Sequence, residues 1–132
     1  MTAAIETWTF PDGMGVPHPS GAYAHATALG DTLFVTGQLP IDPDTNALVA
    51  GDIVAQTNQV MKNLARVLDL CGSGIDRVVQ ARSFLAAERD FAGYDDTFRS
   101  WFPTRLPSRT TIVVVGFAIP EALIEIDLVA AR

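Results

Sequence analysis

The sequence predicts a single α+β domain in which two helices pack on one face of a mixed β-sheet. The hydrophobic pattern switches along the chain between a period of about 2, typical of strands, and a period of about 3.6, typical of helices. The predicted segments follow one another as strand pair, helix, strand, helix and strand pair. Because 132 residues can bury one core but are too few for two ordinary domains, residues 1–132 are expected to form one domain.

A β-hairpin is predicted in the N-terminal part of the chain. Two β-rich runs, 23–29 and 32–39, are separated by a Gly-Asp pair, which is the signal of a two-residue turn. Antiparallel pairing about that turn sets His25 near Thr36. A short extra strand is expected at residues 5–8.

Two helices and a strand between them are predicted next. Residues 52–71 carry apolar side chains at helical spacing, and Gly72 follows as a stop signal. Residues 78–86 are expected to form a strand. Asp90 caps a second helix, which Pro103 ends. The apolar stripe of that helix consists of Phe91, Tyr94, Phe98, Trp101 and Phe102.

The closing segment, residues 107–132, predicts a second hairpin with a longer connection. Arg109 lies at the start of its first β-rich run and Glu125 lies inside the second. Antiparallel pairing about residue 117 would place these two side chains nearly opposite each other. Such a pair could bind and hydrolyse an anionic substrate, or it could be a plain cross-strand ion pair, and the spacing leaves both open.

The last strand has one apolar face and one mixed face. The apolar face suits packing under two helices and consists of Ile124, Ile126, Leu128 and Ala130. The mixed face of this hairpin consists of Leu123, Glu125, Asp127 and Val129 with Arg109, Thr111, Val113 and Val115. Since two helices cannot cover both faces, the mixed face must either meet water or pack against another copy of the chain. Val113 and Val115 suit a wet face poorly, which favours the oligomer.

Composition excludes several classes of function. The net charge is −6 and Lys62 is the only lysine, so binding to nucleic acid through phosphates is not expected. The longest apolar run has strand length, which predicts no membrane-spanning segment. A single cysteine, Cys71, allows no intrachain disulfide and favours a cytoplasmic protein. No His, Cys or acidic residues have the spacing of metal ligands, so no metal site is expected.

Six segments of the chain together match one known family. They are G-A-Y-A-H-A at 21–26, F-V-T-G-Q-L-P at 34–40, L-D-L-C-G at 68–72, F-A-G-Y-D-D-T-F-R-S-W-F at 91–102, P-S-R-T-T at 107–111 and P-E-A-L-I-E-I-D-L-V-A at 120–130. With these segments the chain resembles the RidA/YjgF family of reactive-intermediate (imine/enamine) deaminases. The V-T-G-Q-L-P, P-S-R and I-E-I pieces, in this order and at these distances, are specific together.

The resemblance implies a chorismate-mutase-like α+β fold and a homotrimer. In that trimer three sheets would form a central barrel with helices outside, and active sites would lie in clefts between subunits. The resemblance also implies that Arg109 grips the carboxylate of a small anionic substrate and that Glu125 assists the attacking water. Tyr23 and Thr36 would line the substrate site.

The implied reaction is hydrolytic deamination of reactive 2-imino or 2-enamino acids to 2-oxo acids and ammonia, with no cofactor. Two positions depart from the family pattern. Thr111 stands two places after Arg109, where active deaminases commonly have cysteine, and Asp95 stands where the family often has asparagine. Asp95 would bring a negative charge near an anionic substrate, at the edge of the apolar stripe.

Two alternatives therefore stay open beside the general deaminase. One is a pathway-specific enamine deaminase, for example of an aminomuconate-type compound. The other is a non-catalytic member that binds small ligands or acts like a chaperone. The family has also carried the label of ribonuclease or translation inhibitor, but the acidic charge and the missing basic groove argue against it.

Overall fold

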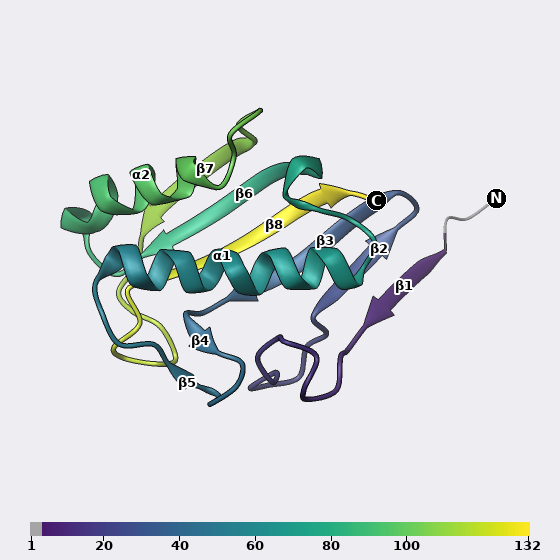
Figure 1. Cartoon of the computed structure of the whole chain (residues 1–132), viewed down its shortest axis with the longest axis horizontal. Coiled ribbons are helices and arrows are strands. Elements are labelled where there is room, and N and C mark those ends of the chain that lie inside the picture. Colours follow the sequence, from purple (N-terminus) through teal and green to yellow (C-terminus); the bar gives the residue numbers. More distant parts are fainter. Residues whose placement is uncertain (1–3) are drawn as a thin grey trace.

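The computed structural model describes residues 4–132, and apart from two short unpredicted strands, β4 and β5, its elements follow the predicted order (Figure 1). The strands are β1 (Ile5–Trp8), β2 (Ala26–Leu29), β3 (Thr32–Gln38), β4 (Ile41–Asp42), β5 (Ala47–Leu48), β6 (Val78–Leu85), β7 (Ser108–Val113) and β8 (Ile124–Ala131). The α-helices are α1 (Ile53–Leu70) and α2 (Phe91–Ser100). A short 3₁₀ turn, Ile75–Arg77, lies between α1 and β6, and another, Glu88–Asp90, directly precedes α2. Neither α-helix of this described part is long and apolar enough to cross a membrane.

Six strands form one mixed sheet in the order β1-β2-β3-β8-β6-β7. All neighbours are antiparallel except β6 and β7, which run parallel. The predicted N-terminal hairpin is confirmed, because Ala26 pairs with Val35 and the Thr36 N–H donates to the His25 carbonyl oxygen at 3.1 Å. Strands β4 and β5 form a separate small hairpin.

Both helices lie on one side of the sheet, as predicted (Figure 1). Asp52 caps α1 by accepting a hydrogen bond from the Ala55 N–H at 3.1 Å, and Gly72 follows the helix with φ +79°, a conformation that favours glycine. The core between the helices and the sheet includes Val60, Met61, Leu64, Val67, Leu68, Tyr94, Phe98, Ile124, Ile126, Leu128 and Ala130. The predicted apolar face of the last strand therefore packs under the helices.

The predicted closing hairpin is wrong. Strands β7 and β8 do not pair with each other, because β6 lies between them and pairs with both. The physical reason is α2, which connects β6 to β7 as a crossover helix. A crossover returns the chain parallel to the strand it left, so β7 occupies one edge of β6 and β8 the other.

This topology also corrects the predicted faces of β7. Arg109 pairs with Ala81, whose side chain is buried under the helices, so Arg109 and Thr111 point toward the helices. Val113 belongs to the same face by alternation, although 54% of it is exposed, and Val115 lies beyond the strand. Glu125 projects from the opposite face of β8, so the two side chains predicted to face each other lie on different sides of the sheet.

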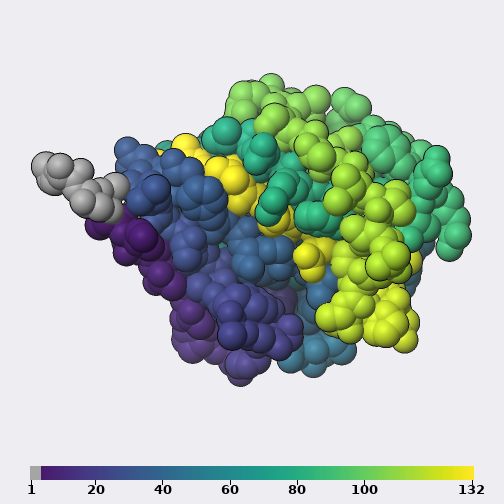
Figure 2. All heavy atoms as spheres, turned by 180° about the vertical axis from the view of Figure 1, so that it is seen from behind, coloured from purple at the N-terminus to yellow at the C-terminus, as the bar shows by residue number. Residues whose placement is uncertain are grey.

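The other side of the sheet is open within one chain. Figure 2 shows this side, with β8 as a yellow band between the blue of β3 and the teal of β6. A depression of about 580 Å³ lies on it, lined among others by Phe34, Arg82, Asp127 and Val129. Phe34 and Val129 pair across β3 and β8, and Phe34 is 44% exposed. An apolar patch of this kind on a sheet face is typical of a contact with another subunit.

Candidate active site

Glu125 lies at the start of β8 against the backbone of β3. A Cβ atom at Gly37 would lie only 2.7 Å from Glu125 Oε2, so the glycine of the V-T-G-Q segment leaves the space that the carboxylate occupies. Burial raises the pKa of the Glu125 carboxyl, and the nearby charge of Asp127 raises it further. A carboxylate whose pKa is raised toward the working pH is suited to accept a proton from water.

Glu125 shares a cavity of about 340 Å³ with two other predicted site residues, Tyr23 and Thr36. The N-terminal loop forms one wall with Pro17, His18, Pro19 and Ser20. The connection between β7 and β8 closes another side with Ala118 and Ile119. The lining therefore combines the carboxylate of Glu125, the phenol of Tyr23 and the hydroxyls of Thr36 and Ser20 with apolar residues of both walls. A few polar groups among apolar ones are typical of small-molecule sites.

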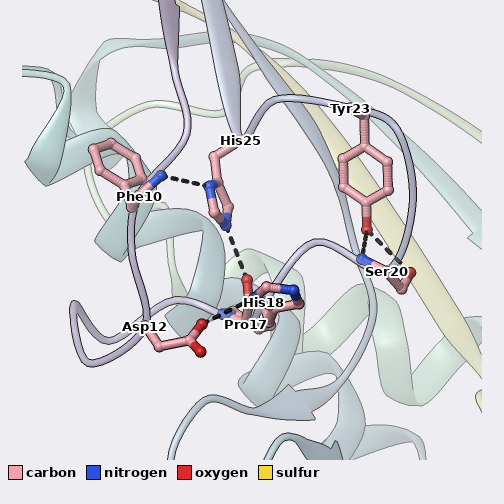
Figure 3. Close-up of polar contacts among 7 residues, drawn as sticks. All are labelled: Phe10, Asp12, Pro17, His18, Ser20, Tyr23 and His25. Atoms are coloured by element: carbon pink, nitrogen blue, oxygen red, sulfur yellow. Dashed lines mark hydrogen bonds and ion pairs between the residues drawn. The ribbon is translucent and has the colours of Figure 1, made fainter.

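The ring of Tyr23 is fixed by the loop that precedes it. Its hydroxyl accepts a hydrogen bond from the Ser20 backbone N–H at 2.9 Å and lies 3.2 Å from Ser20 Oγ (Figure 3). On the same loop, His18 Nδ1 lies 3.0 Å from an Asp12 carboxylate oxygen, and both side chains are largely exposed. These contacts give the loop a defined shape beside the cavity.

The remaining predicted site residues gather elsewhere, around Arg109 on the helix side of β7. The guanidinium of Arg109 lies over the rings of Tyr94 at 4.8 Å, Phe98 at 4.9 Å and Phe91 at 5.8 Å. Its Nη2 donates to Asp95 Oδ1 at 2.7 Å. The Arg109 side chain is 20% exposed, so it is mostly enclosed by α2.

Asp95 is held by two arginines. The hydrogen bond from Arg109 lowers the pKa of the Asp95 carboxyl, with smaller contributions from the charges of Arg109 and Arg99. Arg99 Nη2 lies 3.5 Å from the other carboxylate oxygen. Thr111 Oγ1 lies 2.8 Å from the Tyr94 hydroxyl, which fixes the tyrosine beneath Arg109. Asp95 and Thr111 are thus the immediate surroundings of the arginine.

One chain therefore brings the predicted site residues together as two clusters. Tyr23, Thr36 and Glu125 share the cavity on one side of the sheet, whereas Arg109, Asp95 and Thr111 lie together on the other. Gly37 and the loop at 17–20 also belong to this site, although the sequence pattern alone did not point to them. The glycine in the V-T-G-Q segment was the available sequence signal for Gly37. The clustered prolines were the signal for the loop at 17–20.

No group of three or more His, Cys, Asp or Glu side chains among residues 4–132 is placed to hold a metal ion. Cys71 is buried at the C-terminal end of α1, and burial raises the pKa of its thiol to about 11. The candidate residues themselves offer carboxylate, guanidinium and hydroxyl groups.

Comparison with known proteins establishes the family. The family model described as Endoribonuclease L-PSP matches residues 15–132. A RutC family protein of Sulfurisphaera tokodaii is 36% identical over 116 residues, which cover 88% of this chain and 92% of the relative. The 2-iminobutanoate/2-iminopropanoate deaminase of Rattus norvegicus is 32% identical over 117 residues, with coverage of 88% and 84%. The chain belongs to this family, which is the RidA/YjgF family that the sequence resembles.

Solved structures agree with the fold. A protein of the conserved Rid family from Yersinia pestis superposes with a TM-score of 0.91 at 32% identity, covering 98% of this chain and 100% of that one. RidA from the Antarctic bacterium Psychrobacter sp. PAMC 21119 gives a TM-score of 0.89 at 26% identity, with coverage of 96% and 99%. The mixed sheet with two helices on one face is thus the fold of these proteins.

Proposed function

We propose that this protein is a cytoplasmic homotrimeric deaminase that hydrolyses small 2-imino or 2-enamino acids to 2-oxo acids and ammonia. The observation that carries the proposal is Glu125, a partly buried carboxylate with a raised pKa, in a cavity with Tyr23 and Thr36. The family and the deaminase of Rattus norvegicus at 32% identity support it. The net charge of −6 argues against a ribonuclease.

In this reaction Glu125 accepts a proton from water as the water oxygen bonds to the imine carbon. The imine nitrogen takes up a proton and becomes an amine, which leaves a carbinolamine. The amine then takes up a second proton, the carbon–nitrogen bond breaks and ammonia departs, while the hydroxyl loses its proton as the C=O bond forms. Both protons of the water thus end on the ammonia, and Glu125 is a carboxylate again. Water is the only co-reactant, so the step needs no oxidant or reductant.

The homotrimer is part of the proposal because Arg109 and Glu125 of one copy cannot reach one substrate. They project from opposite faces of one sheet, and β7 is an edge strand. An edge strand with exposed Ile112 and Val113 is a place where a second copy can approach. We propose that Arg109 of one copy binds the substrate carboxylate beside the Glu125 cavity of another. The planar guanidinium suits a bidentate contact with that carboxylate.

A second candidate is a member that binds small ligands without turnover. The observation that favours it is Asp95, which already occupies the Arg109 guanidinium with a carboxylate of the same chain. A third candidate is a pathway-specific enamine deaminase, for example for an aminomuconate-type compound. The contact between Arg109 and Asp95 allows it, because Asp95 would disfavour the binding of simple imino acids.

The test is turnover of a freshly generated imine. An amino-acid oxidase supplies 2-imino acids of several side chains, and semicarbazide traps whatever imine survives. We expect the protein to lower the trapped imine and raise free 2-oxo acid, and the Glu125→Gln variant to lack this effect. Equal trapping with and without protein across the whole panel would reject the deaminase and favour the non-catalytic binder.

A further inference from the structure

A single imidazole bonds both ends of the turn at 11–16, directly before the loop residues 17–20 that wall the Glu125 cavity. His25 lies directly before β2 and is 1% exposed. Its Nδ1 lies 3.0 Å from the Phe10 backbone nitrogen, and its Nε2 lies 2.9 Å from the Pro17 carbonyl oxygen (Figure 3). The ring also packs on the Phe10 ring, with 5.3 Å between centroids. The residues joined in this way begin and end the turn at 11–16.

These two contacts require one form of the imidazole. A backbone N–H can only donate, so Nδ1 of His25 must present its lone pair to Phe10. A carbonyl oxygen can only accept, so Nε2 must carry the proton that bonds Pro17. His25 is therefore neutral and protonated on Nε2. Both nitrogens are already committed to the backbone, so the ring is not placed to exchange protons with a substrate.

The segment that His25 fixes continues into the cavity. Residues 17–20 form one wall, and Ser20 at the end of that wall donates to the Tyr23 hydroxyl at 2.9 Å. The backbone carbonyl of His25 accepts from Thr36 at 3.1 Å on the neighbouring strand. One residue thus connects the loop wall with the strand that carries Thr36.

We infer that His25 is a positioning residue: its neutral Nε2–H imidazole holds residues 17–20, and through Ser20 the ring of Tyr23, in place beside Glu125. The two hydrogen bonds that join His25 to Phe10 and Pro17 are called the loop clamp, and this clamp follows from the contacts alone. The effect of His25 on substrate binding rests on the proposed function. The two parts are therefore tested by separate measurements.

The clamp is tested without substrate. In the wild-type protein, ¹⁵N NMR of the two histidine rings should show His25 with an unprotonated Nδ1 and a protonated Nε2. Hydrogen exchange at the Phe10 backbone amide should be slow in the wild type and fast in His25→Leu. It should stay slow in His25→Gln, because the glutamine side chain still offers one acceptor and one donor. His18→Gln assigns the two ring signals, because His18 is the only other histidine of the sequence. Ser73→Ala is the matched control for exchange, because Ser73 also bonds a backbone carbonyl, that of Ala131 at 2.6 Å, but does not line the cavity. A charged His25 ring, an Nδ1–H form, or unchanged Phe10 exchange in His25→Leu would overturn the clamp.

The positioning role is tested with 2-oxobutanoate as a product-like probe and with oxidase-generated imine as substrate. We expect His25→Leu to weaken binding and raise KM roughly tenfold, because the wall loses a buried hydrogen bond, with a smaller change in kcat. His25→Gln should restore most of the affinity, and Ser73→Ala should match the wild type. Normal binding and KM in a His25→Leu protein with a released loop would overturn the role. If the wild type neither binds the probe nor turns over imine, the proposed function fails, while the NMR and exchange results still decide the clamp.

Discussion

Arg109 donates a hydrogen bond to Asp95 at 2.7 Å, and this ion pair joins β7 to α2. The helical position of Asp95 predicted a carboxylate at the rim of the apolar stripe, and the structure places that carboxylate on the guanidinium itself. A substrate carboxylate bound by Arg109 would therefore lie close to the Asp95 carboxylate, which already bonds the same guanidinium. The negative charge of Asp95 should therefore weaken the binding of simple anions to Arg109.

The first prediction is that Asp95→Asn strengthens the binding of simple imino acids. The asparagine removes the negative charge, so KM should fall about fivefold, which is the effect of roughly 1 kcal/mol of Coulomb repulsion at close range in water. The turnover number should change little, because Asp95 is not assigned to the chemistry. Steady-state kinetics with oxidase-generated imines measure both quantities.

Asp96→Asn is the matched control for this experiment, because it removes the same charge from the next residue of α2, whose side chain is exposed. It should leave KM unchanged. Loss of turnover on every substrate in Asp95→Asn would instead make Asp95 a catalytic group. Identical kinetics in both variants and the wild type would show that the ion pair does not control substrate binding.

The second prediction concerns Arg109. Lysine keeps the charge but loses the planar fork that stacks on Tyr94 and Phe98, and alanine loses both. Both variants should lose roughly 100-fold in kcat/KM, consistent with about 1.5–3 kcal/mol for a charge-assisted hydrogen bond. Circular dichroism should show an unchanged fold. Arg99→Lys serves as control, since Arg99 also contacts Asp95 but is largely exposed. Normal turnover in Arg109→Ala would mean that the arginine is purely structural.

Local pattern was enough to predict both helices and the strands of the main sheet, but neither the short strands β4 and β5 nor all of the strand neighbours. The helical spacing of apolar residues in 52–71 and the Gly-Asp turn before Thr32 each depend on nearby residues, and both predictions are confirmed. The partner of β7 depends on the route of the chain through α2. Alternation of side chains says which residues share a face, but it does not say which strand lies beside them. For this reason the Arg109 face was predicted wrongly.

The grouping of the candidate site residues was predictable only in part. Glu125, Tyr23 and Thr36 were expected to share a site from the motifs that contain them, and they line one cavity. The role of His25 could not be read from the sequence, because its imidazole bonds backbone atoms at Phe10 and Pro17 in an irregular loop. No side-chain pattern encodes such contacts.

The third prediction is a trimer in solution, held by the open face of the sheet. Phe34 and Val129 pair on that face, and burying each in an interface stabilises the assembly by roughly 1.5–3 kcal/mol per subunit. Multi-angle light scattering should give the trimer mass for the wild type and a smaller species for Val129→Glu. Val54→Glu is the control, because Val54 is 42% exposed on α1, away from that face. A wild-type monomer at micromolar concentration would contradict both the trimer and a site shared between subunits.

The last prediction separates the stability of the protein from its activity at Glu125. Burial raises the pKa of this carboxyl in the folded protein, whereas in the unfolded chain it has its ordinary value. Below the unfolded pKa both states hold the proton, and Glu125 has no ionisation cost. As the pH rises the unfolded chain ionises first, so the free energy of unfolding falls until the pH passes the folded pKa. Above that point the loss is constant.

Glu125→Gln cannot ionise, so it should escape this loss while also losing the proton acceptor. We expect the variant to be inactive yet more stable than the wild type at neutral pH, with the advantage shrinking as the pH falls toward 4. Urea unfolding at several pH values measures the difference, and Glu121→Gln, which replaces an exposed glutamate nearby, should show none of this pH dependence. Activity should rise with pH as Glu125 ionises, over a range above that of an ordinary glutamate. A Glu125→Gln protein that turns over imine normally would remove Glu125 from the mechanism, and one whose stability difference is the same at every pH would show that its ionisation is not linked to folding.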